Sequence, residues 1–179
     1  MIQIRIHGRG GQGVVTAAEL IAIAAFASGK YAQAFPSFGV ERTGAPIVSF
    51  ARIDDQPIRT REQVYQPNVL IVQDATLLET VNITEGCDEN TIIIVNTAKT
   101  KEEIKIKIGQ VYTVDATKIA LEIIQKNIVN TVILGAFAKI TKLVTLEGLK
   151  KAVHQKFEEK GKGIIDKNIK AITSIFESL

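Results

Sequence analysis

The sequence predicts an α/β fold, in which a mostly parallel sheet carries helices on both faces and the last third of the chain is helical. Two observations predict it. Short apolar runs alternate with helical segments between residues 69 and 126, which is typical of a parallel sheet whose strands are buried on both faces. A glycine-rich turn also joins the first strand directly to the first helix. The 179 residues show no linker or repeat, so we expect a single domain over residues 1–179.

Each expected element follows from the local pattern of apolar residues. Strands are expected at 2–7, 31–35, 46–53, 69–74, 91–96 and 111–115. Helices are expected at 14–28, 76–82, 116–126, 130–142, 145–160 and 166–178, the last three capped by Asn130, Thr145 and Asp166. The helix over 14–28 holds six alanines and one charge, which predicts that it is buried. Elements in this order make a Rossmann-like three-layer arrangement.

Three of the expected strands end on a polar residue, namely Asp74, Asn96 and Asp115. The carboxyl ends of the strands border the ligand crevice in open α/β sheets, so these side chains are candidates to line one. A local alternative exists for Asp74 and Asp115, because each precedes a helical segment and a carboxylate there suits an N-cap. Both interpretations remain open from the sequence.

The composition excludes several classes of protein and site. A net charge of +3 is too small to indicate nucleic-acid binding, and no apolar run approaches the roughly 18 residues that span a membrane. The chain begins with an alternating strand and shows no signal peptide, so we expect a cytoplasmic protein. Its single cysteine, Cys87, cannot hold an iron–sulfur cluster, and His7 and His154 lie far apart, so we expect no metal site.

Arginines and lysines are distributed unevenly along the chain. All six arginines fall within the first 61 residues, whereas fifteen of the sixteen lysines follow residue 98. The planar guanidinium suits bidentate recognition of phosphate or carboxylate, whereas scattered lysines usually keep a surface soluble. The N-terminal third is therefore the better place to look for a site, and chance clustering is the alternative.

Residues 8–13 read Gly-Arg-Gly-Gly-Gln-Gly and satisfy the pattern G-x-G-x-x-G between a strand and a helix. Such a turn brings backbone N–H groups close to a ligand, and the helix start offers an anion a partial positive charge. Arg9 and Gln12 are placed to add contacts. A private NAD site also needs an acidic residue after the second strand, but residues 30–40 contain none and Glu41 follows late. The alternative is that the glycines serve only packing or a subunit contact.

The loop over residues 35–46 holds two prolines, two glycines and two aromatic residues around the pair Glu41-Arg42. A loop of this length between strands is usually functional or interfacial, and a solvated crossover is the alternative. No serine, cysteine or histidine lies in a recognisable catalytic context, and the Gly-Asp-Gly motif of thiamine enzymes is absent. We therefore predict no catalytic residue in this chain.

Four segments occur in order: Gly-Arg-Gly-Gly-Gln-Gly-Val-Val-Thr-Ala-Ala (8–18), Phe-Gly-Val-Glu-Arg-Thr-Gly-Ala-Pro-Ile-Val-Ser-Phe-Ala-Arg-Ile (38–53), Val-Asp-Ala-Thr-Lys-Ile-Ala (114–120) and Asn-Thr-Val-Ile-Leu-Gly-Ala (130–136). Together they resemble the γ subunit of 2-oxoacid:ferredoxin oxidoreductases, over nearly the whole chain. The Glu-Arg-x-Gly-Ala-Pro form favours the pyruvate branch, with the 2-oxoglutarate, 2-oxoisovalerate and indolepyruvate branches as alternatives. Thr43 stands where the family usually has Arg or Gly.

This resemblance implies a heteromeric enzyme that oxidises a 2-oxoacid with coenzyme A to acyl-CoA and CO₂ and passes the electrons to ferredoxin. It implies α, β and ferredoxin-like δ subunits as partners. Thiamine diphosphate and Mg²⁺ then belong to the α and β chains, and iron–sulfur clusters to the β and δ chains. The γ chain is expected to complete the assembly and to help receive coenzyme A.

We therefore expect the glycine turn to hold a coenzyme A phosphate or to line its approach. The expected cofactor-binding residues are Gly8, Arg9, Gly10, Gly11, Gln12, Gly13, Arg42 and Thr43. One rival hypothesis is a purely structural γ subunit, in which the turn and the loop over 35–46 only meet partner chains. Another is an independent nucleotide-binding oxidoreductase domain, which the missing ribose acid disfavours.

Overall fold

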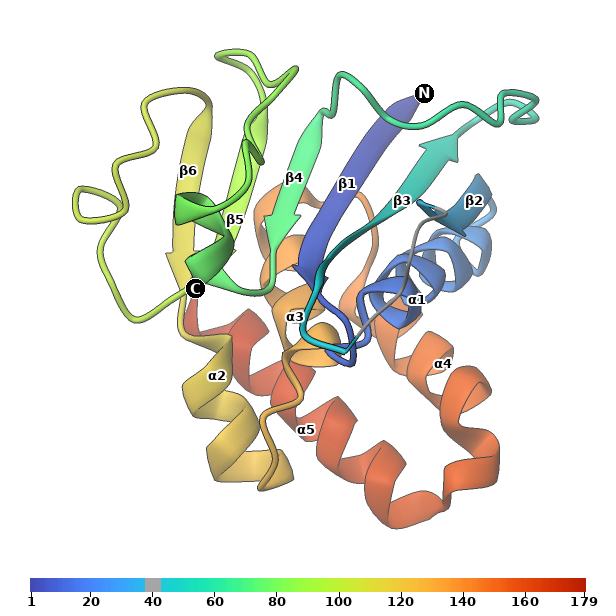
Figure 1. Ribbon diagram of the computed structural model, residues 1–179. Coiled ribbons are helices and arrows are strands. Elements are labelled where there is room, and N and C mark those ends of the chain that lie inside the picture. Colours follow the sequence, from blue (N-terminus) through green and yellow to red (C-terminus); the bar gives the residue numbers. More distant parts are fainter. Residues whose placement is uncertain (38–42) are drawn as a thin grey trace.

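Figure 1 shows the computed structural model of the chain, which describes residues 1–37 and 43–179. A six-stranded sheet has the order β2-β3-β1-β4-β5-β6. Its strands are β1 (Ile2–Arg9), β2 (Tyr31–Pro36), β3 (Pro46–Asp54), β4 (Val69–Val72), β5 (Ile92–Asn96) and β6 (Gln110–Val114). β1, β4, β5 and β6 run parallel, while β3 pairs antiparallel with both β1 and β2. The carboxyl ends of the four parallel strands therefore meet at one edge of the sheet.

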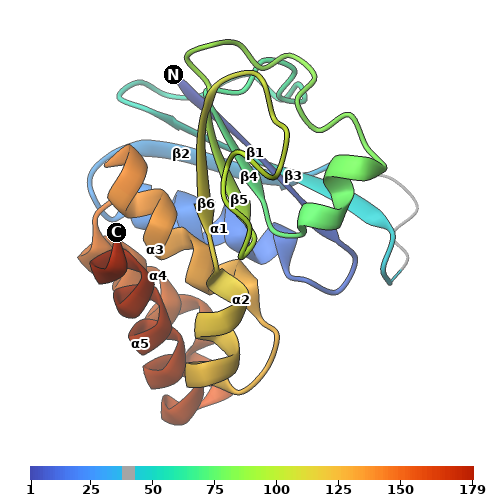
Figure 2. The ribbon, with the colours of Figure 1, turned by 90° about the vertical axis from the view of Figure 1, so that its left-hand side faces the viewer.

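The helices of the described residues lie mainly in the C-terminal third of the chain. They are α1 (Val14–Phe26), α2 (Ala116–Ile119), α3 (Val129–Thr141), α4 (Leu146–Phe157) and α5 (Lys162–Ser178). Shorter turns of helix are the 3₁₀-helices η1 (Ala75–Glu79) and η3 (Glu158–Lys160) and the π-helix η2 (Ala120–Ile124). Figure 2 shows α1 to α5 together on one side of the sheet, with the turn of η1 on the other.

One face of the sheet, which we call the helix face, is covered by α1 to α5. Alternate strand residues such as Ile4, Ile6, Ile71 and Ile94 point into this layer, and all are fully buried. They pack against the alanine-rich side of α1 and against α3, whose Phe137 is also fully buried. Because successive strand side chains alternate between faces, the residues between them must point the other way.

The opposite face, which we call the loop face, is covered by η1 and by loops. Leu70, Val72, Ile93 and Val95 form a smaller apolar cluster there, beneath η1 and the segments that precede β5 and β6. Above β1 and β3 the cover is the loop over residues 55–68. Little helix therefore covers this face. The peptide groups of the covering loops must find hydrogen-bond partners that a helix would supply from its own backbone.

The α/β class, the mostly parallel sheet and the helical C-terminal third are confirmed. Helices on both faces were expected, but in the described residues α1 to α5 cover one face alone, because the connections from β4 to β5 and from β5 to β6 hold no helix longer than η1. Thr145 caps α4, since its hydroxyl accepts a hydrogen bond from the Gly148 N–H at 2.9 Å. The predicted caps Asn130 and Asp166 are wrong. The N-cap of α3 is Ile128, and α5 begins at Lys162, four residues before Asp166, because Gly161 (φ 86°) ends η3 and starts the new helix. The helix expected near 76–82 is a single 3₁₀ turn.

Candidate functional site

The site predicted from the glycine pattern lies beside β1, at the point where the strand order reverses. From β1 the chain passes through α1 to β2 and β3 on one side, whereas β4 and the later strands lie on the other. The carboxyl ends of β1 and β4 flank this reversal point, which we call the crevice because ligands usually bind there in open α/β sheets. The turn Gly8–Gly13 and the residue Asp74 both lie there.

The glycines of the turn have different structural roles. A Cβ atom on Gly8 would lie 2.5 Å from Val14 Cγ2, and one on Gly13 would lie 2.3 Å from Asn130 Nδ2, so both permit close packing. Gly13 also has a φ of 69°, and Gly11 has a φ of 91°, a conformation that side chains rarely adopt. Within residues 1–37 and 43–179, a Cβ on Gly11 would meet only the Thr43 methyl group, at 4.0 Å. The two ends of the turn are thus tightly packed, whereas the described residues leave its middle uncrowded.

The side chains of Arg9 and Gln12 hold the turn to the end of β4. Gln12 Oε1 accepts from the Arg9 N–H at 2.7 Å, and Gln12 Nε2 donates to Asp74 Oδ2 at 2.9 Å. Arg9 Nε donates to the same oxygen at 3.2 Å, and Arg9 Nη2 donates to Thr76 Oγ1 at 2.7 Å. Arg9 Nη1 reaches the Gly44 carbonyl at 3.1 Å. One guanidinium therefore joins the turn, the loop before β3 and the start of η1.

Asp74 is ionised in this arrangement. Partial burial raises the pKa of Asp74, but the hydrogen bonds from Thr76 and Gln12 and the charge of Arg9 outweigh it, so the pKa falls below its usual value. Each terminal nitrogen of Arg9 carries two hydrogens and uses one of them within the described residues. The guanidinium is thus held by its own chain and still has donors for a ligand.

The start of α1 carries no side-chain cap among the described residues, because its N-cap is Gly13. Its first N–H groups therefore lie at the crevice with the positive end of the helix dipole. Asn130, which the sequence placed as a helix cap, instead donates from Nδ2 to the Gly13 carbonyl at 3.3 Å. It ties the beginning of α3 to the glycine turn, so the two helix starts are fixed side by side.

The structure brings most of the predicted site residues together. Thr43 forms a parallel bridge with Gly10, and the Gly10 N–H donates to the Ala45 carbonyl at 2.9 Å, so the end of the loop before β3 lies against the turn. Arg42 lies outside the described residues, as do residues 38–41. Of the strand-end residues, Asp115 caps α2, while Asn96 donates to the Gln73 carbonyl at 2.9 Å.

The arginine cluster of the N-terminal third divides into two groups. Arg5 and Arg52 are buried on the loop face, where they donate to backbone carbonyls of the covering loops. Arg59 and Arg61 are exposed on the loop over 55–68. Among the arginines whose surroundings the structure describes, Arg9 is the one at the crevice.

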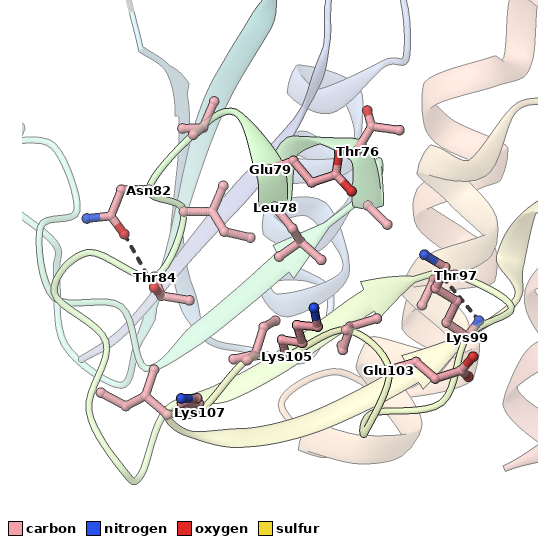
Figure 3. A pocket seen from close by; sticks show the side chains of 16 residues that line it. Thr76, Leu78, Glu79, Asn82, Thr84, Thr97, Lys99, Glu103, Lys105 and Lys107 are labelled. Carbon is pink, nitrogen blue, oxygen red and sulfur yellow. Dashed lines mark hydrogen bonds between the residues drawn. The ribbon is translucent and has the colours of Figure 1, made fainter.

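A cleft of about 820 Å³ opens on the loop face, between η1 and the segment before β6. Thr76 and Leu78 line it from η1, and Lys99, Lys105 and Lys107 line it from the other side (Figure 3). Thr76 also accepts the hydrogen bond from Arg9, so one residue of the cleft contacts the glycine turn.

The residues of this cleft were not among the predicted site residues. The lysines were expected only to keep the surface soluble, although residues 104–108 alternate between isoleucine and lysine. The three isoleucines pack against the small apolar cluster of the loop face, which leaves Lys105 and Lys107 at the rim. Strict alternation in a segment without regular structure is the signal that could have found them.

The described part of the chain shows neither a metal-binding cluster nor a membrane-spanning helix. No group of three His, Cys, Asp or Glu side chains among residues 1–37 and 43–179 is arranged to hold a metal ion. Within the same residues no helix is both long and apolar enough to cross a membrane.

Comparison with known proteins places the whole chain in one family. The sequence model of the family described as pyruvate ferredoxin/flavodoxin oxidoreductase matches residues 3–178. The common subunit gamma of the pyruvate/ketoisovalerate oxidoreductases from Thermococcus kodakarensis is 53% identical over 98% of this chain and 96% of its own length.

Solved structures agree with this relationship. The PORC subunit of pyruvate oxidoreductase from Thermotoga maritima shares 41% identity and a TM-score of 0.86, over 98% of this chain and 95% of its own. The 2-oxoglutarate:ferredoxin oxidoreductase from Magnetococcus marinus, solved with 2-oxoglutarate, coenzyme A and succinyl-CoA bound, shares the fold at 19% identity and a TM-score of 0.79. That match covers 99% of this chain and 31% of the longer one. The chain therefore belongs to the pyruvate ferredoxin/flavodoxin oxidoreductase family, as one of its gamma subunits.

Proposed function

We propose that this gamma subunit receives coenzyme A at the glycine turn of an enzyme that oxidises a 2-oxoacid to acyl-CoA and CO₂. The enzyme passes the electrons to ferredoxin, and pyruvate is the 2-oxoacid. The backbone of Gly10 to Gly13 and the start of α1 approach a phosphate of coenzyme A, and Arg9 donates to it. Thr43 lies against the same turn, and Arg42, which is outside the described residues, stays a predicted contact.

The observation that carries this proposal is the uncapped start of α1 at the reversal point of the sheet, with Arg9 fixed beside it. Backbone N–H groups and a helix dipole at such a position favour a phosphate group. The ion pair of Arg9 with Asp74 holds the guanidinium in place before a ligand arrives, which lowers the entropy lost on binding.

Partner chains complete the proposed enzyme. The single cysteine of this chain cannot ligate an iron–sulfur cluster, which takes about four thiolates. The family resemblance implies thiamine diphosphate and Mg²⁺ on the α and β subunits and the clusters on the β and δ subunits, and the single cysteine of this chain fits that division. The related Magnetococcus enzyme was solved with coenzyme A bound, which supports coenzyme A as the co-substrate.

The choice of 2-oxoacid is assigned to the partner chains. The Thermococcus relative is named as common to pyruvate and ketoisovalerate oxidoreductases. A gamma chain that serves two such enzymes cannot itself select the oxoacid. Activity on 2-oxoisovalerate is therefore the second candidate for this chain, with pyruvate supported by the name of the Thermotoga relative.

Substitution of Arg9 tests the coenzyme A contact. In the reconstituted complex, Arg9→Ala should raise the KM for coenzyme A about tenfold or more, because a hydrogen bond to a charged group contributes about 1.5–3 kcal/mol. Arg59→Ala, which removes an exposed arginine away from the turn, serves as the matched control. An unchanged KM with the complex intact would contradict the proposal.

The same variants separate the rival functions. A purely structural gamma subunit predicts that Arg9→Ala weakens copurification of the partner chains and leaves the coenzyme A kinetics alone. Thr76→Val removes one hydrogen-bond partner of Arg9 and keeps the guanidinium charge. The change in KM for this variant therefore measures the effect of losing that one hydrogen bond. Saturable binding of NAD or FAD to the isolated chain would instead support an independent nucleotide-binding domain.

A further inference from the structure

Asn130 is a buried polar residue that joins the glycine turn to the start of α3. Its side chain is 6% exposed, and its Nδ2 donates to the Gly13 carbonyl at 3.3 Å. Within residues 1–37 and 43–179 its Oδ1 is also buried and has no hydrogen-bond partner. A buried polar atom without a partner destabilises a fold. Stability alone therefore does not account for an amide at this position, and its bond to Gly13 needs another explanation.

This bond acts on the first peptide group of α1. The Gly13 carbonyl also accepts the Ala17 N–H at 3.0 Å, which is the first hydrogen bond of the helix. The peptide between Gly13 and Val14 is trans, so its carbonyl and its N–H point in opposite directions. Holding the Gly13 carbonyl therefore also fixes the direction of the Val14 N–H, which lies at the crevice.

Gly13 is the residue at which this orientation needs support. It has a φ of 69°, and glycine adopts positive and negative φ with similar ease, so its own conformation does not fix the peptide plane. A Cβ there would lie 2.3 Å from Asn130 Nδ2, so the amide packs directly against the glycine backbone. The residue after Asn130, Thr131, is fully buried and donates to Asn168 Oδ1 of α5 at 2.6 Å. The amide thus reaches the turn from a helix start that is itself fixed.

We propose that Asn130 is a positioning residue for coenzyme A, which orients the Val14 N–H at the start of α1 and does not itself touch the ligand. The inference rests on the proposed function, because it gives a buried residue a part in binding coenzyme A at the glycine turn. A change at Asn130 then alters the affinity for coenzyme A and leaves the chemical step as it is.

Asn130→Leu tests the proposal, because leucine has nearly the same shape and no donor. The Gly13 carbonyl keeps its bond from the Ala17 N–H, and the unpartnered Oδ1 is removed, so the urea midpoint of the purified chain should not fall. In the reconstituted complex the KM for coenzyme A should rise about fivefold or more, while kcat stays within about twofold of the parent value. The affinity falls because the first peptide of α1 is no longer held in its binding orientation.

Thr131→Val is the matched control, because it removes a buried hydrogen bond of the same helix turn that does not reach the glycine turn. It leaves Asn168 Oδ1 without its donor, so the urea midpoint should fall, whereas the KM for coenzyme A should stay at the parent value. If Asn130 only supported the fold, KM would follow stability, and Thr131→Val would have the larger effect on it.

Asn130→Asp is the second variant, which keeps the proposal testable if the leucine variant does not fold. A carboxylate has almost the shape of the amide, cannot donate to the Gly13 carbonyl and repels a nearby phosphate. The KM for coenzyme A should therefore rise about tenfold or more. An unchanged KM in both Asn130 variants, an equal rise in Thr131→Val, or loss of partner chains from the complex in the Asn130 variants would overturn the proposal.

The Arg9→Ala variant separates this inference from the proposed function. If Arg9→Ala raises the KM for coenzyme A while the Asn130 variants leave it unchanged, the coenzyme A role of the turn stands and Asn130 has no part in it. If none of these variants changes the KM, both proposals fail together.

Discussion

The two faces of the sheet are covered in different ways, and the difference separates the part of the molecule that stabilises the fold from the part that presents a site. On the helix face, apolar strand residues meet apolar helices, and fully buried side chains such as Ile6 and Phe137 fill the space between them. On the loop face, Arg5 and Arg52 are buried beneath loops.

The physical reason is that a helix satisfies its own backbone hydrogen bonds and a loop does not. A helix can therefore cover a sheet with apolar side chains alone. The loops over β1 leave carbonyl groups that need donors, and Arg5 supplies them to the carbonyls of Val64, Tyr65, Ile83 and Glu85. Such a cover is less tightly packed, and the cleft beside η1 lies in it.

The largest effect is expected from a deletion on the helix face. Phe137→Ala should lower the free energy of unfolding by about 4 kcal/mol, because it removes a fully buried ring and leaves a cavity that the packed helices cannot close. Urea denaturation of the purified chain measures it. Phe26→Ala is the control, since Phe26 is 73% exposed, and should cost about 0.5 kcal/mol or less. Equal losses for the two variants would mean that Phe137 is not part of a tightly packed core on the helix face.

A smaller and more local effect is expected on the loop face. Arg5→Met should cost about 2–3 kcal/mol, because the carbonyls of the covering loops lose charged donors. These loops should also become more sensitive to limited proteolysis, while the helices stay protected. Arg59→Ala, which removes an exposed side chain from the covering loop over 55–68, should change neither measurement. If Arg5→Met leaves the cleavage pattern as it was, the arginine does not hold the loops.

The smallest effect concerns the pH dependence of stability. Burial, and then the charge of Arg5, lowers the pKa of His7 to about 4, so this side chain is neutral in the folded chain. In the unfolded chain it takes up a proton below pH 6.5, so folding loses stability as the pH falls from 6.5 toward 4. The loss from His7 at pH 5 should be about 2 kcal/mol relative to pH 7.

His7→Gln isolates this contribution, because the amide does not titrate. The difference in unfolding free energy between pH 7 and pH 5 should be about 2 kcal/mol smaller in the variant than in the parent chain. An identical pH dependence for both proteins would mean that His7 is already protonated or exposed in the folded state.

The sequence predicted those features of the site that depend on residues close together in the chain. The glycines of residues 8–13 act within one turn, so their spacing alone indicates the strand, the turn and the helix start. The partner of Arg9 could not be predicted, since Asp74 is 65 residues away and meets it only through the order of the strands. The role of Asn130 was misjudged for the same reason, because the Gly13 carbonyl that takes its amide is 117 residues away.

The sequence by itself determined the order of strands and helices, the position of the glycine turn and the family of the chain, because these depend on short-range patterns along the chain. Only the tertiary structure decided that Arg5 supports loops while Arg9 faces the crevice, although both lie on the same strand face. Likewise, only the tertiary structure showed that three lysines line the cleft. Strand pairing brings groups from distant parts of the chain together, and their energies depend on burial and partners that no local pattern contains.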